Sequence, residues 1–239
     1  METEQIEQIE ERFKRRYRQK KLLNILVSAV IVLLGCSSLA FIWNYDRDGA
    51  LTFRWMTVDG TVFTAFIALC YVAVSAFELS RYTELTSRVV YYIRLASAVA
   101  ESMIMIAVLL SQFPFSPQRM HIFRYDMFNM HLLIPVLTVA SFLMNDSPIG
   151  KLKAGKLFHG TWFVTLYAAV VLTLILTGVI SREMIPYAFM DVAHMTAPAV
   201  AACLASVYGL GFLLSWLISC GNRKLSWLWY RGIASIKRD

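Results

Sequence analysis

The chain has 239 residues, of which 58% are hydrophobic and only 16% are charged, and its mean hydropathy is +0.56. Soluble domains are roughly half apolar and about one quarter charged, so this composition excludes an ordinary soluble enzyme. The net charge of +7 comes from Lys and Arg clusters beside apolar segments, which indicates membrane topology and argues against nucleic-acid binding. The four cysteines lie in or at the ends of apolar segments and predict neither disulfides nor a metal site.

Six apolar segments of membrane length follow one another along the chain. A helix needs about 20 apolar residues to cross the hydrocarbon core, whereas the strands of a β-barrel alternate over shorter segments. The connections are short, so the sequence predicts an all-α polytopic membrane protein, a bundle of six transmembrane helices. The predicted spans are Leu22–Trp43, Met56–Phe77, Val89–Gln112, Phe123–Met144, Phe158–Ile180 and Met195–Cys220.

Positive charge is concentrated at alternate ends of these segments. Of the 23 Lys and Arg residues, 17 lie at one set of ends, in residues 12–21, at 81 and 88, in 151–156 and in 223–238. The positive-inside rule therefore places both termini in the cytoplasm. We expect a basic juxtamembrane N-terminal helix over 1–21, a six-helix transmembrane domain over 22–220, and a basic cytoplasmic C-terminal tail over 221–239.

The second, fourth and sixth spans then share a direction, and their first turns meet in the outer leaflet. Polar residues gather in these turns: Thr57 and Asp59, then Asn129 and His131, then Tyr187, Asp191 and His194. A hydroxyl and an imidazole at matched depth are the minimum for nucleophilic attack on an ester. An ionisable group inside a span is itself a functional-site hypothesis. Thr57 is the candidate nucleophile and His131 the candidate base.

The threonine belongs to a stripe that has a simpler explanation. Thr57, Thr61 and Thr64 share one helix face. Small and hydroxyl residues line ordinary helix contacts in membranes, and packing explains the stripe as a whole. For Thr57 alone the pattern leaves both interpretations open.

Pro135 follows His131 by four residues and cannot donate a hydrogen bond to the carbonyl of residue 131. Too few residues remain after Pro135 to span a membrane, so the proline is expected inside the helix, where it predicts a kink beside the imidazole.

Arg94 and Glu101 lie two turns apart on one face of the third span. They are expected to satisfy each other through a third group or to snorkel, and a proton path is the less favoured alternative.

Three motifs resemble one family. The segments Phe53–Asp59, Asn129–Pro135 and Ile185–Val192 are similar, in order and spacing, to the androgen-induced-gene/ADTRP-like family of six-span membrane proteins, which has bacterial relatives. The resemblance implies a membrane threonine hydrolase. Animal members cleave fatty acid esters of hydroxy fatty acids with a threonine nucleophile and a histidine, and those two roles fall on Thr57 and His131.

We therefore expect a lipid ester hydrolase, multi-pass in a bacterial cell membrane, with its site toward the extracytoplasmic leaflet and with no cofactor or metal. Its expected partners are a lipid ester substrate and the bilayer. Asn129 or a backbone N–H is the expected oxyanion donor, and Asp191 or Asp59 is expected to orient His131. Tyr187 and His194 complete the supporting set.

Two alternatives remain open at this point. A six-span electron-transfer protein would bind haem between His131 and His194, although no second histidine pair lies at the inner face. A transporter or channel would use the same polar residues as an outer vestibule.

The charge asymmetry generates a topology prediction. A cysteine introduced near Asp48 or Arg182 should react with a membrane-impermeant thiol reagent applied outside the cell, and one near Lys153 should not. The parent protein is the control for its own cysteines. The reverse labelling pattern would move the candidate site to the cytoplasmic leaflet.

Overall fold

The computed structural model describes residues 2–45, 49–81, 87–112, 123–146 and 153–234, and in these ranges it contains helices and no strand. Six helical segments are long and apolar enough to cross a membrane: Glu10–Tyr45, Met56–Arg81, Arg88–Leu110, Tyr125–Met144, Ala154–Leu176 and Ala197–Trp227. The predicted all-α class and the number of spans are therefore confirmed.

Several of the spans are built from more than one helical element. In chain order the elements are α1 (Glu2–Tyr45), η1 (Gly49–Arg54), α2 (Met56–Arg81), α3 (Arg88–Ala107), η2 (Val108–Gln112), α5 (Tyr125–Phe128), η3 (Asn129–Leu133), α6 (Ile134–Asn145), α7 (Ala154–Leu157), η4 (Phe158–Thr161), α8 (Trp162–Leu176), η5 (Arg182–Met184), η6 (Ala188–Met190), η7 (Val192–His194) and α9 (Ala197–Ala234). The elements η2 and η3 are π-helical, and η1, η4, η5, η6 and η7 are short 3₁₀ turns.

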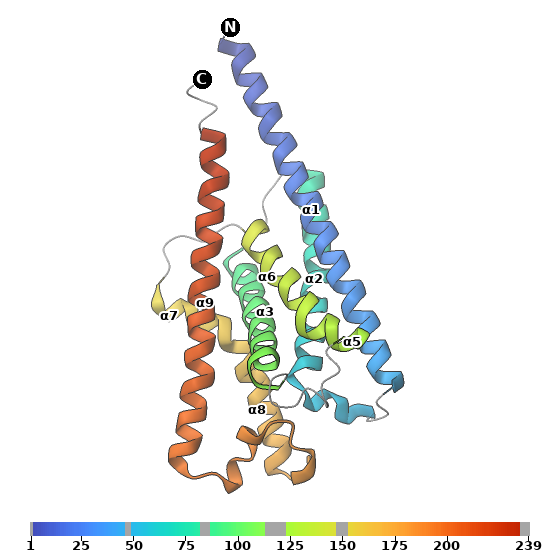
Figure 1. The fold of residues 1–239 in the computed structure, drawn as a ribbon. Coiled ribbons are helices and arrows are strands. Elements are labelled where there is room, and N and C mark those ends of the chain that lie inside the picture. The colour runs from blue at the N-terminus through green and yellow to red at the C-terminus, as the bar shows by residue number, and fades with distance from the viewer. Residues whose placement is uncertain (1, 46–48, 82–86, 113–122, 147–152, 235–239) are drawn as a thin grey trace.

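The long helices form one bundle around α3 (Figure 1). Helix α1 packs along α2 and α6, and α9 packs against α3 and α6 on the other side. The beginning of α1 and the end of α9 lie at the same end of the bundle (Figure 1). We call this the terminal end, and the end that holds η1 and the connection from α8 to α9 the loop end. Both α1 and α9 continue as helix across the boundaries expected at residues 21 and 220.

Helix α3 is central because its side chains are small enough to let neighbouring helices approach. Ala96, Ala98 and Ala100 are completely buried, and they alternate with Leu95 and Val99 in the main apolar core. Close contact between small residues is the usual basis of helix packing in lipid, where the hydrophobic effect does not drive helices together. In α3, 67% of the apolar stretch is buried, against 17% in α9, so α3 is the helix around which the others assemble.

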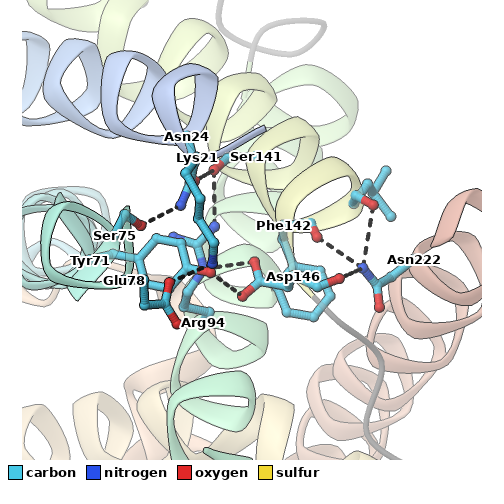
Figure 2. A network of polar contacts seen from close by, with 11 residues as sticks. Lys21, Asn24, Tyr71, Ser75, Glu78, Arg94, Ser141, Phe142, Asp146 and Asn222 are labelled. Atoms are coloured by element: carbon cyan, nitrogen blue, oxygen red, sulfur yellow. Dashed lines mark hydrogen bonds and ion pairs between the residues drawn. The ribbon is translucent and has the colours of Figure 1, made fainter. Parts of the chain in front are cut away.

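A buried ionic network joins the helices toward the terminal end (Figure 2). Arg94 of α3 donates from Nε to Asp146 Oδ2 at 2.7 Å, and Tyr71 of α2 donates to Asp146 Oδ1 at 3.2 Å. The guanidinium of Arg94 also lies 3.7 Å from the centre of the Tyr71 ring. Arg94 is therefore satisfied by the carboxylate of Asp146, at the end of α6, and not together with Glu101 through a shared third group as expected.

The same network reaches α1 and α9. Lys21 of α1 forms an ion pair with Glu78 of α2, and both side chains are buried. Asn222 of α9 donates from Nδ2 to the backbone carbonyl of Asp146 at 2.7 Å. Two buried ion pairs thus connect α1 to α2 and α3 to the end of α6, and one buried amide attaches α9 to them.

The Arg94–Asp146 pair generates a stability prediction. Arg94→Met leaves the Asp146 carboxylate buried without its cation, and we expect a loss of about 3–5 kcal/mol in the free energy of unfolding. Adding Asp146→Asn removes the uncompensated charge and should recover part of this loss. Thermal unfolding of the purified protein in detergent measures both effects.

Lys14→Met is the matched control, because the Lys14–Glu10 pair is exposed on both sides. Its expected cost is about 0–1 kcal/mol. An Arg94→Met protein that unfolds at the same temperature as Lys14→Met would show that the network does not hold the helices together.

Candidate active site

The structure brings Thr57 and His131 into contact at the loop end of the bundle. Thr57 lies in the first turn of α2, and His131 lies in the π turn η3 within the fourth span. Thr57 Oγ1 is 3.3 Å from His131 Nε2, although 74 residues separate the two along the chain. The imidazole is buried, and the threonine is partly exposed. The pair expected from matched depth is therefore one hydrogen-bonded unit.

The second nitrogen of His131 determines how that unit can act. His131 Nδ1 lies 2.9 Å from the backbone carbonyl oxygen of Met127. A carbonyl oxygen only accepts hydrogen bonds, so this contact requires the proton of the neutral ring to be on Nδ1. The lone pair of Nε2 then faces the hydroxyl of Thr57. This tautomer allows His131 to accept the threonine proton.

Pro135 explains the local backbone that presents His131. The helix continues through the proline, as expected, but a π turn takes the place of a simple kink: the N–H of Ile134 donates to the carbonyl of Asn129, five residues earlier. A wider turn accommodates the carbonyl that Pro135 cannot satisfy. The proline therefore places an irregular turn at the histidine.

Two tyrosines hold the start of α2 in place. Tyr167 of α8 donates its hydroxyl to the carbonyl of Arg54 at 2.5 Å. The ring of Tyr187 packs edge-on against Trp55 at 5.8 Å, and Tyr187 lines the same cavity as Met56 and Thr57. Burial raises the pKa of Tyr187 to about 12, so the phenol is a hydrogen-bond donor at neutral pH. Tyr187 thus approaches the threonine that His131 also contacts.

A cavity of about 530 Å³ opens beside Thr57. This volume falls in the range of roughly 300–1,000 Å³ typical of small-molecule sites. Its wall is mostly apolar and comes from α2, α3, α8, α9 and the segment that connects α8 to α9. The side chains that line it include Met56, Thr57, Met103, Ile104, Val164, Tyr167, Tyr187, Phe189, Val207 and Leu210. The wall carries the hydroxyls of Thr57, Tyr167, Tyr187 and Ser206 among otherwise apolar side chains, so the cavity can hold a largely apolar molecule that has one polar group.

The remaining predicted residues are not all gathered at this point. Asn129 donates from Nδ2 to Ser38 Oγ of α1 at 3.2 Å, so its amide is used between helices. Asp59 lies in the first turn of α2, two residues after Thr57. The orienting role considered for Asp59 or Asp191 belongs instead to the Met127 carbonyl, which holds Nδ1 of His131.

Asp191 and His194 form a separate cluster at the surface. His194 Nδ1 is 2.7 Å from Asp191 Oδ1, and Arg182 Nε is 3.3 Å from Asp191 Oδ2. The hydrogen bond with His194 holds the pKa of the Asp191 carboxyl below its usual range. His194 is more than half exposed, whereas both ring nitrogens of His131 are engaged by protein groups. This arrangement does not favour a haem held between the two histidines.

Sequence reasoning missed the two groups that complete the site. The Met127 carbonyl is a backbone atom without a side-chain signature, and Tyr167 is one aromatic residue in an apolar span. Pro135 was the available signal for an irregular backbone at His131. No protein-family model, curated protein or solved structure matches this chain. What the site can do is therefore inferred from its geometry and from the three sequence motifs.

Proposed function

We propose that this protein is a membrane-embedded hydrolase of lipid esters in which Thr57 is the nucleophile and His131 is the general base. The observation that carries this proposal is the 3.3 Å contact between Thr57 Oγ1 and the unprotonated Nε2 of His131. Thr57 itself lies on the wall of a mostly apolar cavity. A nucleophile, a base and a group that orients the base are the recurring elements of acyl transfer.

The first half-reaction transfers the acyl group to the protein. Thr57 Oγ1 attacks the ester carbonyl carbon while its proton moves to His131 Nε2. The tetrahedral intermediate collapses when the bond to the alcohol oxygen breaks and His131 returns the proton to that oxygen. The products of this step are an alcohol and an acyl-threonine ester, and His131 is again neutral.

The second half-reaction releases the acid. Water takes the place of the alcohol, His131 Nε2 accepts one of its protons, and the oxygen attacks the acyl-threonine carbonyl. Collapse breaks the bond to Thr57 Oγ1, which recovers its proton from His131. The Met127 carbonyl keeps the imidazole in one tautomer and stabilises the imidazolium that forms twice in each cycle.

The negative charge on the carbonyl oxygen needs donors near Thr57. In the first turn of α2 the N–H groups of Val58 and Asp59 donate to the Trp55 carbonyl, so the N–H of Thr57 is the backbone donor we propose. The Tyr187 hydroxyl is the second donor that we propose, because Tyr187 and Thr57 line the same cavity. Fixed donors of this kind stabilise the transition state without reorganising.

The substrate class follows from the cavity and from the resemblance. An apolar cavity of about 530 Å³ suits a long acyl chain better than a polar solute. The three motifs favour fatty acid esters of hydroxy fatty acids, the substrates of the animal members of the androgen-induced-gene/ADTRP-like family. The charge distribution favours a site in the extracytoplasmic leaflet, and the resemblance, which includes bacterial relatives, favours a bacterial cell membrane.

The central test treats Thr57 and His131 as a unit. Thr57→Ala should abolish fluorophosphonate labelling and lipid-ester hydrolysis, and Thr57→Ser should keep part of both because the hydroxyl remains. His131→Ala should lower kcat/KM by about 10²–10⁴-fold. The double variant should lose little more than Thr57→Ala alone, because residues that act in one step are not additive.

Thr61→Ala is the matched control for this series. Thr61 is one turn further along the same helix, is completely buried, and is expected to pack without taking part in the chemistry. It should label and hydrolyse like the parent protein. Hydrolysis at the parental rate by Thr57→Ala would contradict the proposed mechanism.

A second test concerns Tyr187. Tyr187→Phe keeps the ring packing against Trp55 and Phe189 but removes the hydroxyl. We expect kcat to fall about 10²-fold, the usual cost of losing one oxyanion donor, with KM nearly unchanged. Steady-state kinetics with a chromogenic acyl ester measure both constants. An unchanged kcat would leave stabilisation of the oxyanion to the backbone of α2.

A further inference from the structure

Glu101 is a buried acid that the proposed hydrolase chemistry does not use. It lies in α3, and its side chain is completely buried. Neither carboxyl oxygen has a hydrogen-bond partner of good geometry among the described residues. The backbone of α2 passes close by at Gly60, where an added Cβ would lie 3.8 Å from Glu101 Oε1. Glu101 is therefore about one helical turn further into the bundle than Thr57.

No charged side chain in the described part of the chain pairs with Glu101. Arg94, two turns away on α3, is engaged by Asp146 and Ser141. Three further ionisable groups on the elements around α3 have partners elsewhere: Glu78 pairs with Lys21, His131 contacts Thr57, and His159 packs against Tyr92. Asp59 of α2 is itself an acid and cannot compensate a second carboxylate. An ionised carboxylate left alone in such an interior is strongly unfavourable.

The hydroxyl that faces this side of α3 from α2 is that of Thr64: Gly60 lies beside Glu101, and Thr64 is one turn further along α2. Thr64 Oγ1 is in turn 2.9 Å from Ser97 Oγ of α3. A protonated Glu101 can donate to Thr64, which can donate to Ser97, because each hydroxyl both donates and accepts. The hydroxyls of Thr64 and Ser97 therefore form a hydrogen-bonded chain from Glu101 to the preceding turn of α3.

A small cavity lies beside the hydroxyls of Thr64 and Ser97. It has a volume of about 10 Å³, and the polar part of its wall comes from α2, α3 and α6, namely Thr64, Arg94, Ser97, Thr138 and Ser141. The apolar side chains of Ile31, Ile67, Ala68 and Phe142 complete the wall. One water molecule needs roughly 10–15 Å³ and two to four polar partners. Thr138 Oγ1 is buried without a hydrogen-bond partner, so it offers the water an unused position. Ser97 and Ser141 supply the others, and Ser141 already belongs to the network in Figure 2.

We propose that Glu101 is an intramembrane proton-binding site that exchanges its proton through Thr64 and Ser97 with one water molecule held between α2, α3 and α6. In each exchange Glu101 gives its proton to Thr64 Oγ1, Thr64 passes its own to Ser97, and Ser97 passes its own to the water. The reverse steps return a proton to Glu101, so bonds and charges balance. Deuterium enters the acid by the same route after the water has exchanged with solvent.

Infrared spectroscopy of the full chain in lipid nanodiscs tests the bound proton. The difference between wild type and Glu101→Gln at neutral pH should contain the C=O band of a protonated carboxylic acid, and sodium chloride should not remove it. Carboxylate bands in that difference spectrum would overturn the proposal. Loss of the acid band on adding sodium would assign the site to a cation and would also overturn it.

Transfer to D₂O tests the path, because deuteration shifts the same band. Thr138→Val keeps the shape of the side chain but removes the hydroxyl that holds the water. We expect it to slow the shift by about tenfold or more, since exchange then requires a local opening of the helices. Ser97→Ala should slow it similarly and serves if Thr138→Val does not fold. Thr138→Ser should behave like wild type.

Thr61→Val is the matched control, because Thr61 also carries a buried, unpaired hydroxyl on α2 but does not line the small cavity. It should exchange at the wild-type rate. Equal rates in wild type, Thr138→Val and Ser97→Ala would overturn the path. These measurements do not use ester hydrolysis, so their outcome is independent of the function proposed for Thr57 and His131.

Discussion

The structure depends on pairing polar side chains inside a bundle that lipid surrounds. In the hydrocarbon region no water is available to compensate an exposed charge, so each charge has to find its partner within the protein. Arg94 and Asp146 meet this requirement at the end of the central helix, and Lys21 and Glu78 meet it between the first two. Once these pairs form, α1 is attached to α2, and α3 to the end of α6, in one arrangement.

The same requirement shapes the candidate active site. Pro135 removes one backbone hydrogen bond, and the chain responds with a π turn that presents His131 to Thr57. The imidazole of His131 is buried, and its second nitrogen, Nδ1, donates to the Met127 carbonyl. The hydrogen bond that a buried imidazole needs for stability thus also fixes the tautomer that a general base needs. Chemistry and stability draw here on the same hydrogen bonds.

Glu101 departs from this rule and is informative for that reason. Where the rest of a structure is consistent, a buried polar group without a partner marks strain, function or a bound species that has not been drawn. Thr138 shows the same departure across a cavity of one water's size. A proton on Glu101 removes the uncompensated charge, and a water molecule beside Thr138 supplies the missing hydrogen-bond partner.

The all-α class, the six spans and the proximity of Thr57 to His131 could be predicted from the sequence, because helix length, apolar composition and the depth of polar residues are local properties. The family itself stays a prediction. The charge pairs could not be predicted. The spacing along α3 suggested that Arg94 and Glu101 are satisfied together, whereas helix packing places Arg94 against Asp146, which is 52 residues away in the chain.

The orienting group was missed for a related reason. Asp59 and Asp191 have the right chemistry, but a carbonyl four residues from His131 is closer and costs no second buried charge. The sequence by itself determined which segments enter the membrane and which residue types lie at each depth. Only the tertiary structure decided which of them touch, because helix rotation and contact depend on side chains far apart in the chain.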